Sequence, residues 1–162
     1  MVRVGIIGCG KIAQVRHIPE YLDNPNAKLT GLYDLNLQRA KNLAEKYGCK
    51  SYESIEEMLA DPEIDAVSVC VANHVHAEIT IAALKAGKHV LCEKPMATTL
   101  KDCQMMVDTA EQMGKKLMIG QNQRFAKAHA EAKKIIERGD IGSVLTFKTT
   151  FGHGCLLYTS PS

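Results

Sequence analysis

The sequence predicts an α/β protein built on a doubly wound parallel sheet. Short apolar segments alternate with amphipathic segments of helical period along most of the chain. The connections between them are short, and such an alternation favours parallel strands joined by crossover helices. In addition, the first apolar segment runs directly into a glycine-rich turn, GCG at residues 8–10, which is where sheets of this kind often bind a ligand.

Two strand–helix pairs are predicted at the start of the chain. Residues 2–8 (VRVGIIG) are a continuous apolar run that ends in glycine, the pattern of a strand buried on both faces. The helix that follows is broken or restarted by Pro19, and residues 27–34 form the second strand. The next helix has Asn36 as its N-cap and Gly48 at its C′ position.

A short helix and a further strand–helix pair occupy the middle of the chain. Ser54 and Glu57 have the spacing of a capping box, and Pro62 ends the helix that this box begins. Residues 64–71 (IDAVSVCV) are the next apolar strand, and residues 75–86 are helical.

The last part of the predicted sheet follows the same alternation. Residues 89–92 (HVLC) form a strand, and Thr99 and Asp102 cap the helix after it. Residues 116–120 (KLMIG) form another strand, and a helix then runs to about Arg138.

Length and composition are those of an ordinary globular chain. The 162 residues are 46% hydrophobic and 23% charged, with a net charge of +2, so about one domain with its own core is expected. No basic block points to nucleic acid, and no apolar run approaches the ~18 residues of a membrane span. We therefore expect neither a nucleic-acid partner nor a membrane partner. The apolar N-terminus is interrupted by glycines and is interpreted as a strand, not a signal peptide.

Six cysteines are spread along the chain without a recognisable pattern. They are Cys9, Cys49, Cys70, Cys92, Cys103 and Cys155. None forms a C-x-x-C pair and no histidine spacing completes a zinc site, so no bound metal is expected. Reduced thiols in the cytoplasm are the simplest interpretation.

The turn GCGKIA at residues 8–13 has the form G-x-G-x-x-A between a strand and a helix. In a dinucleotide-binding turn of this form, Gly8 makes the tight turn and Gly10 lets the backbone approach a pyrophosphate. The small third residue, Ala13, permits close packing of helix on strand. The helix start, with Lys11 and Ile12, then faces the phosphates. The alternative is a purely structural glycine turn.

An acidic residue, Asp34, ends the second strand 21 residues after Ala13. Its carboxylate is placed to accept hydrogen bonds from the adenosine ribose hydroxyls of NAD. The 2′-phosphate of NADP would meet this negative charge, because Leu35 and Asn36 add no cation and Arg39 lies a turn further on. NAD is therefore favoured over NADP as the cofactor.

The segment VANHVHAE at residues 71–78 follows a strand at its carboxyl end, where ligands of such sheets bind. Ala72, Asn73 and His76 are cofactor-binding candidates in this segment, because the amide and the imidazole could hydrogen-bond a ribose or a nicotinamide. Local capping of the helix that follows is the alternative.

In GKHVLCEKPMA, residues 87–97, a strand runs straight into Glu93-Lys94-Pro95. Hydride transfer from an alcohol requires the hydroxyl proton to leave. Lys94, placed near a nicotinamide ring and partly desolvated, could hold or relay that proton. Pro95 stiffens the turn, and its peptide bond is a candidate for the cis form. Otherwise Lys94 is an ordinary surface lysine.

Together, GCGKIA, Asp34, ANHVHAE and AALKAGKHVLCEKPMA resemble the Gfo/Idh/MocA oxidoreductases, the glucose–fructose oxidoreductase and inositol dehydrogenase family. The resemblance covers residues 2 to about 154. It implies a Rossmann domain that binds NAD(P), followed by an α/β domain that forms the substrate site and the contacts of a homo-oligomer. It further implies hydride transfer to or from a sugar, a polyol or a related compound.

The resemblance also assigns roles to single residues. It implies that Lys94 is the catalytic-site lysine, that Glu93 supports the nicotinamide end, and that Asn73 and His76 lie by the cofactor. Arg124 is a candidate for touching the cofactor or the domain interface.

Four parts of the chain are expected. Residues 1–120 form the Rossmann domain and residues 121–142 a connecting helix region. Residues 143–154 begin a truncated substrate domain, of which VLTFKTTF supplies only the first, half-exposed strand. Residues 155–162 (CLLYTSPS) match a translated sequencing adaptor and are interpreted as a non-native tail.

The chain is thus expected to be the N-terminal half of an NAD(P)-dependent dehydrogenase acting on CH–OH groups. By itself it is expected to bind NAD weakly and to be catalytically incomplete, because the substrate domain of such enzymes supplies the rest of the site. Two alternatives remain open at this stage. One is an NAD-binding module without catalysis, and the other is a Rossmann methyltransferase that uses S-adenosylmethionine.

Overall fold

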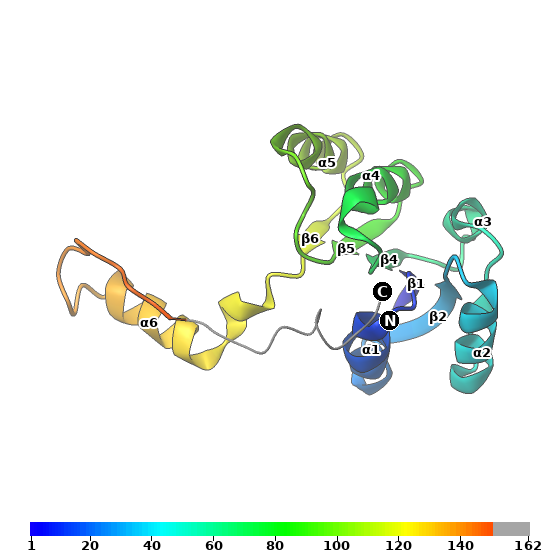
Figure 1. Cartoon of the computed structure of the whole chain (residues 1–162), viewed down its shortest axis with the longest axis horizontal. Coiled ribbons are helices and arrows are strands. Elements are labelled where there is room, and N and C mark those ends of the chain that lie inside the picture. The colour runs from blue at the N-terminus through cyan, green and yellow to red at the C-terminus, as the bar shows by residue number, and fades with distance from the viewer. Residues whose placement is uncertain (151–162) are drawn as a thin grey trace. The chain divides into compact units, whose positions relative to one another are not determined.

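The computed structural model of the chain describes residues 1–150, which belong to two compact units divided after Gln121 (Figure 1). The first unit contains a parallel sheet of six strands in the order β3-β2-β1-β4-β5-β6. The strands are β1 (Val2–Ile7), β2 (Ala27–Tyr33), β3 (Lys50–Ser51), β4 (Ala66–Val69), β5 (His89–Cys92) and β6 (Leu117–Ile119).

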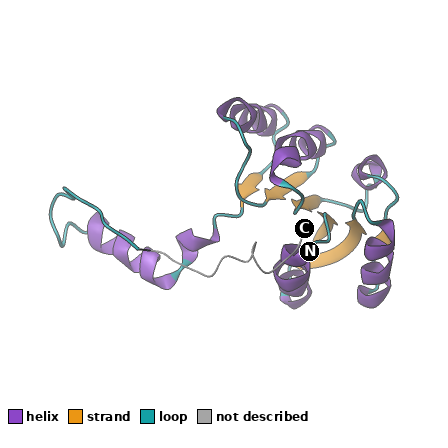
Figure 2. Cartoon of the chain, viewed as in Figure 1, coloured by secondary structure: helices purple, strands orange, loops and turns teal. Residues whose placement is uncertain are grey.

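Helices connect the strands of the first unit, as Figure 2 shows. They are the π-helical turn η1 (Ala13–His17), α1 (Ile18–Asp23), α2 (Leu37–Tyr47), α3 (Ile55–Ala60), the 3₁₀ turn η2 (Asn73–Val75), α4 (His76–Lys85) and α5 (Leu100–Gln112). The second unit contains the 3₁₀ turn η3 (Asn122–Phe125) and α6 (Lys127–Glu137). Within residues 1–150, no helix has the length and apolar character needed to cross a membrane.

The sheet is covered on both faces, which confirms the predicted doubly wound architecture. Neighbouring residues of a strand point to opposite faces, and the fully buried Ile6 and Ile7 of β1 accordingly belong to two separate core clusters. Ile6 packs with Ile18 of α1 and Ala44 of α2. Ile7 lies in the larger cluster, to which α3, α4 and α5 contribute.

Helix boundaries follow the capping residues that the sequence predicts. The side chain of Asn36 accepts a hydrogen bond from the backbone of α2, and Gly48 ends that helix with a left-handed φ of +67°. Ser54 accepts from Glu57 N at 3.0 Å, and Thr99 caps α5 in the same way. These contacts satisfy N–H groups that have no partner inside a helix.

The first crossover differs in detail from an ordinary helix. Proline has no N–H, and its ring collides with the carbonyl group four residues earlier in an α-helix. Pro19 lies at the start of α1, directly after η1, in which Ile18 N bonds to Ala13 O. This wider turn accommodates the proline and leaves both His17 and Ile18 buried. The predicted interruption of the helix near Pro19 is therefore observed, and it takes the form of the π-helical turn η1.

Strand β3 is an element that the sequence does not predict. It has two residues, and it pairs with Gly31 and Leu32 of β2. Two residues are too few to show a period of alternation. Its place in the sheet is defined by the partner strand alone.

The strand predicted from residue 144 onward is absent from the described residues. No regular structure is present in residues 144–150, and Leu145 and Phe147 are 92% and 77% exposed. A strand needs a neighbour to share its backbone hydrogen bonds, and no described strand pairs with this segment. The remainder of the predicted strand and the tail lie outside the described residues.

Lys88 lies directly before β5, at the end of the sheet that is opposite the glycine turn. Its side chain is buried, and its Nζ donates to the carbonyl oxygens of Asp61 and Ile64, both at 2.8 Å. Burial of this amine lowers the pKa of Lys88. The residue therefore holds the loop between α3 and β4.

We expect Lys88→Met to lower the free energy of unfolding by roughly 2–6 kcal/mol, because two carbonyl oxygens lose their donor at a cost of about 1–3 kcal/mol each. Urea unfolding measures the change. Lys116→Met is the matched control, since Lys116 is exposed and its replacement should change stability by less than about 0.5 kcal/mol. Equal stability of the two variants would contradict this role.

Candidate functional site

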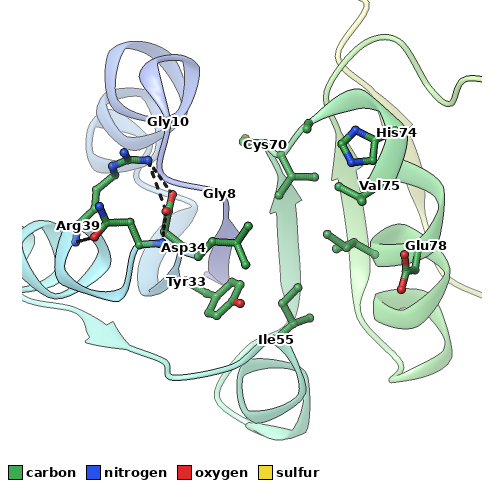
Figure 3. Close-up of a pocket in the computed structure, with 15 residues that line it drawn as sticks. Gly8, Gly10, Tyr33, Asp34, Arg39, Ile55, Cys70, His74, Val75 and Glu78 are labelled. Carbon is green, nitrogen blue, oxygen red and sulfur yellow. Dashed lines mark hydrogen bonds and ion pairs between the residues drawn. The ribbon is translucent and has the colours of Figure 1, made fainter. Parts of the chain in front are cut away.

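The candidate site lies where the strand order reverses. Strands β1 and β4 are neighbours in the sheet, but the connections after them lead to opposite faces, so their carboxyl ends flank a crevice. A pocket of about 600 Å³ occupies this place (Figure 3). Its lining residues are Gly8, Gly10, Tyr33, Asp34, Leu35, Asn36, Arg39, Ile55, Cys70, Val71, Ala72, His74, Val75, Glu78 and Ile79.

The glycine turn forms one wall of the pocket. Gly8 has a φ of +93°, and a Cβ there would lie 2.5 Å from the carbonyl oxygen of Cys70, so only glycine fits. A Cβ at Gly10 would have no heavy atom within 4 Å, which leaves its backbone open to the pocket. Ala13 is fully buried. The structure thus has the tight turn, the open approach and the close helix packing that the sequence predicts.

Asp34 and Arg39 form one end of the pocket. The carboxylate of Asp34 is almost fully buried and accepts hydrogen bonds from Cys9 N at 2.7 Å and Asn36 N at 2.8 Å. Nη1 of Arg39 lies 3.4 Å from both carboxylate oxygens (Figure 3). From its spacing, Arg39 is expected to lie a turn too far along to offset the charge of Asp34, whereas the structure places its guanidinium group against Asp34.

The opposite wall is mainly apolar. Val75 lines it, and Ile55 contributes from α3 (Figure 3). Ile79, one turn after Val75, also belongs to the lining. His74 and Glu78 are the polar side chains on this side, and both are exposed. A wall of this composition suits the flat face of a heterocyclic ring better than a charged group.

The predicted residues of the loop after β4 separate into two groups. Ala72 lines the pocket, whereas the exposed Asn73 and the buried His76 do not. His76 Nδ1 lies 2.7 Å from the carbonyl oxygen of Pro95, and Nε2 lies 3.1 Å from that of Val71. The imidazole therefore bridges two loops at the edge of the sheet, and its contact with a cofactor stays a prediction.

The Glu93-Lys94-Pro95 turn follows β5 at the same edge of the sheet. The Lys94–Pro95 peptide bond is cis, the form that the sequence leaves open. Lys94 is exposed, so this structure does not contain the partial desolvation that the sequence analysis expects for it. Glu93 is mostly buried, with Oε1 2.9 Å from His17 Nε2. None of the three residues of the turn lines the pocket.

The remaining predicted site residues lie outside the pocket lining. Lys11 and Ile12 are exposed directly after the glycine turn. Arg124 belongs to η3 of the second unit, and its contact with cofactor or interface stays a prediction.

The thiols around the site are poor nucleophiles. Burial raises the pKa of Cys9 to about 12 and that of Cys49 to about 11. Burial also raises the pKa of Cys70. All five described cysteines are free. Because the thiolate is the reactive form, these side chains act as small apolar groups. Among residues 1–150, no group of histidine, cysteine and carboxylate side chains could hold a metal ion.

Comparison with known proteins places this site in a defined context. A family model described as an oxidoreductase family with an NAD-binding Rossmann fold matches residues 2–121. Glucose-6-phosphate 3-dehydrogenase from Bacillus subtilis is 36% identical over 151 residues, which cover 93% of this chain and 42% of that protein. Myo-inositol 2-dehydrogenase from Thermotoga maritima is 34% identical, with 92% of this chain and 45% of that protein covered. The chain spans less than half the length of these relatives.

Solved structures show the same fold. An NAD-binding protein from Listeria innocua is similar with a TM-score of 0.78 and 35% identity, over 87% of this chain and 41% of that one. The 3-ketoreductase KijD10 from Actinomadura kijaniata, in complex with NADP and TDP-benzene, has a TM-score of 0.80 and 32% identity, over 85% of this chain and 42% of that one.

Proposed function

The chain belongs to the Gfo/Idh/MocA family of oxidoreductases with an NAD-binding Rossmann fold, and we propose that it is the cofactor-binding part of an NAD(P)-dependent dehydrogenase. The reaction is hydride transfer between the nicotinamide and a hydroxyl or carbonyl group of a sugar or polyol. The observation that carries this proposal is the pocket at the reversal of strand order, with Gly8 and Gly10 at one wall and Asp34 at one end.

The residues present fit a dinucleotide. The pyrophosphate would lie over Gly10, where the absence of a side chain leaves the backbone open, and the start of the following helix would face it. The adenosine ribose would lie at Asp34. The adenine ring would lie between the Asp34 end of the pocket and the apolar wall that contains Val75 and Ile79.

The proposed chemistry divides between the cofactor and the chain. Bound NAD(P) would supply the ring that accepts or donates the hydride. The chain itself would hold the dinucleotide at the glycine turn. It would also present the amine of Lys94 at the same end of the sheet, where this amine takes up or returns the hydroxyl proton of the substrate.

We propose that the chain binds NAD more tightly than NADP, and that Arg39 makes this difference in affinity smaller. Asp34 favours ribose hydroxyls over a 2′-phosphate. Arg39 lies 3.4 Å from the same carboxylate, and its guanidinium group could pair with that phosphate. The two side chains therefore act in opposite directions on the choice of cofactor.

Titrations with NADH and NADPH test this balance. We expect Asp34→Ser to narrow the preference for NADH, because a negative charge is removed. Arg39→Met should widen it by about tenfold, the equivalent of one charge-assisted hydrogen bond to phosphate. Lys41→Met is the matched control, because Lys41 lies on the same helix and its side chain is 46% exposed, as that of Arg39 is. Equal or better binding of NADPH by the unaltered chain would contradict the proposed preference.

The same titrations separate the proposed function from the methyltransferase alternative. An NAD(P)-binding chain should enhance the fluorescence of NADH and should not bind S-adenosylmethionine. The reverse result would overturn the proposal.

We also propose that the 162-residue chain binds NAD(H) without turning over a substrate, so that the binding-module alternative describes the isolated chain. Its relatives are more than twice as long, and Lys94 is exposed. In a longer protein, the substrate domain and a homo-oligomeric assembly would complete the site. We propose a cytoplasmic location, on the ground that the cysteines follow no disulfide or zinc spacing in the sequence.

A further inference from the structure

A chain of four polar side chains ends at Glu93, in the Glu93-Lys94-Pro95 turn. The hydroxyl groups of Tyr21 and Ser68 are hydrogen-bonded to each other. Ser68 Oγ lies 3.3 Å from His17 Nδ1, and His17 Nε2 lies 2.9 Å from Glu93 Oε1. Ser68 is fully buried and His17 is 8% exposed. The proposed function uses none of Tyr21, Ser68 and His17.

These contacts leave the carboxylate of Glu93 little freedom. Its Oε1 lies against His17, and its Oε2 accepts a hydrogen bond from Lys94 N at 3.1 Å. Gly120 lies on another side, where an added Cβ would be only 3.2–3.3 Å from the carboxylate atoms. Because Glu93 in turn bonds the backbone of Lys94, its position affects the position of the turn.

His17 belongs to the segment that begins with the glycine turn. It is the last residue of η1 (Ala13–His17), which starts three residues after Gly10. The π-helical geometry that accommodates Pro19 leaves the imidazole buried between this segment and the end of β5. A single side chain thus joins the segment that follows the glycine turn to the turn that carries Lys94.

We propose that His17 is a positioning residue that holds Glu93, and through it the Lys94 turn, where the nicotinamide half of the bound dinucleotide lies. This inference rests on the proposed function. It implies that loss of the His17–Glu93 contact weakens binding of the nicotinamide half while binding of the ADP-ribose half persists. A histidine that only stabilises the fold would affect both halves alike.

Two amide variants of His17 test this inference. In His17→Gln, the side-chain amide reaches about as far as Nε2 and can still donate to Glu93. In His17→Asn, the amide reaches only as far as Nδ1, so that Ser68 keeps a partner and Glu93 loses one. Binding of NADH and of ADP-ribose, which lacks the nicotinamide, is measured for both variants and for the unaltered 162-residue chain.

We expect His17→Asn to bind NADH about five- to tenfold more weakly, which corresponds to the net loss of one ordinary hydrogen bond, and ADP-ribose within about twofold of the unaltered chain. His17→Gln should restore NADH binding. Gly120→Ala provides a second test, because it pushes Glu93 from the other side and should also weaken NADH selectively.

Equal weakening of both nucleotides in His17→Asn, or no difference between the Asn and Gln variants, would overturn the inference. If His17→Asn does not fold, Gly120→Ala replaces it. Weaker NADH binding with unchanged ADP-ribose binding in that variant supports the inference, and equal weakening of both overturns it. Failure of the proposed function itself gives a different result, since the unaltered chain would then bind neither nucleotide.

Discussion

Gly10→Val should abolish dinucleotide binding while the chain remains folded. A Cβ at this position would meet no heavy atom within 4 Å apart from its chain neighbours, and Gly10 lines the pocket, where the pyrophosphate is proposed to lie. Gly10 is not among the glycines with a positive φ, so valine can adopt its backbone conformation. We expect the NADH affinity to fall at least about a hundredfold, or about 2.8 kcal/mol.

Fluorescence titration with NADH measures the loss, and circular dichroism and thermal melting check the fold. Gly10→Ala is the graded control, because one methyl group should weaken binding less than an isopropyl group. Gly8→Ala provides the contrast. Its Cβ would lie 2.5 Å from the carbonyl oxygen of Cys70 at a φ of +93°, so this variant should melt at a lower temperature. Retained NADH binding in Gly10→Val would remove the phosphate role of this turn.

Lys94→Met should reduce turnover by about 10²–10⁴-fold in an active protein that contains this segment. This range is the usual contribution of a general acid or base. Methionine keeps a long apolar side chain but cannot hold a proton. Because Lys94 is exposed and does not line the pocket, we expect the NADH affinity to change by less than about threefold.

The turnover number and the dissociation constant for NADH, measured on the same preparation, separate catalysis from binding. Lys101→Met is the control, since Lys101 is likewise exposed and lies at the start of α5. An unchanged turnover number in Lys94→Met would make Lys94 an ordinary surface lysine. A large loss of NADH affinity would assign it to cofactor binding instead.

Most of the sheet could be predicted from the sequence because local chemistry marks its elements. Asn36, Ser54 and Thr99 begin helices with side-chain caps, and Gly48 ends one with a left-handed residue. Such signals lie within a few residues of the boundary that they define. Strand β3 has no signal of this kind, since its two residues are ordered only by pairing with β2.

The sequence indicates the candidate pocket where backbone geometry determines it, and only incompletely where long side chains do. Gly8 and Gly10 follow from the turn that they must form. Arg39 lies five residues after Asp34, a spacing that does not indicate a contact, yet its extended guanidinium side chain spans that distance. The contact between His17 and Glu93 joins residues 76 positions apart. No local pattern in a single sequence indicates such a pair.

The segment from residue 144 shows the limit of periodicity. Its alternation of apolar and polar residues is typical of a strand, but a strand also requires a partner for its backbone. The described residues provide none, so Leu145 and Phe147 stay exposed. Alternation therefore indicates which face of a strand would be apolar and does not by itself form the strand.

The central claim is that the pocket between β1 and β4 binds a nicotinamide dinucleotide. The most direct test is titration of the ¹⁵N-labelled chain with NADH, followed by amide chemical shifts. We predict saturable shifts that centre on Gly8, Gly10, Asp34 and Ala72, with ADP-ribose reproducing those at Gly10 and Asp34. Another cavity of the described residues lies between α5 and β6 around Val107 and Leu117. Shifts confined to that cavity, or no shifts in a folded chain, would contradict the claim.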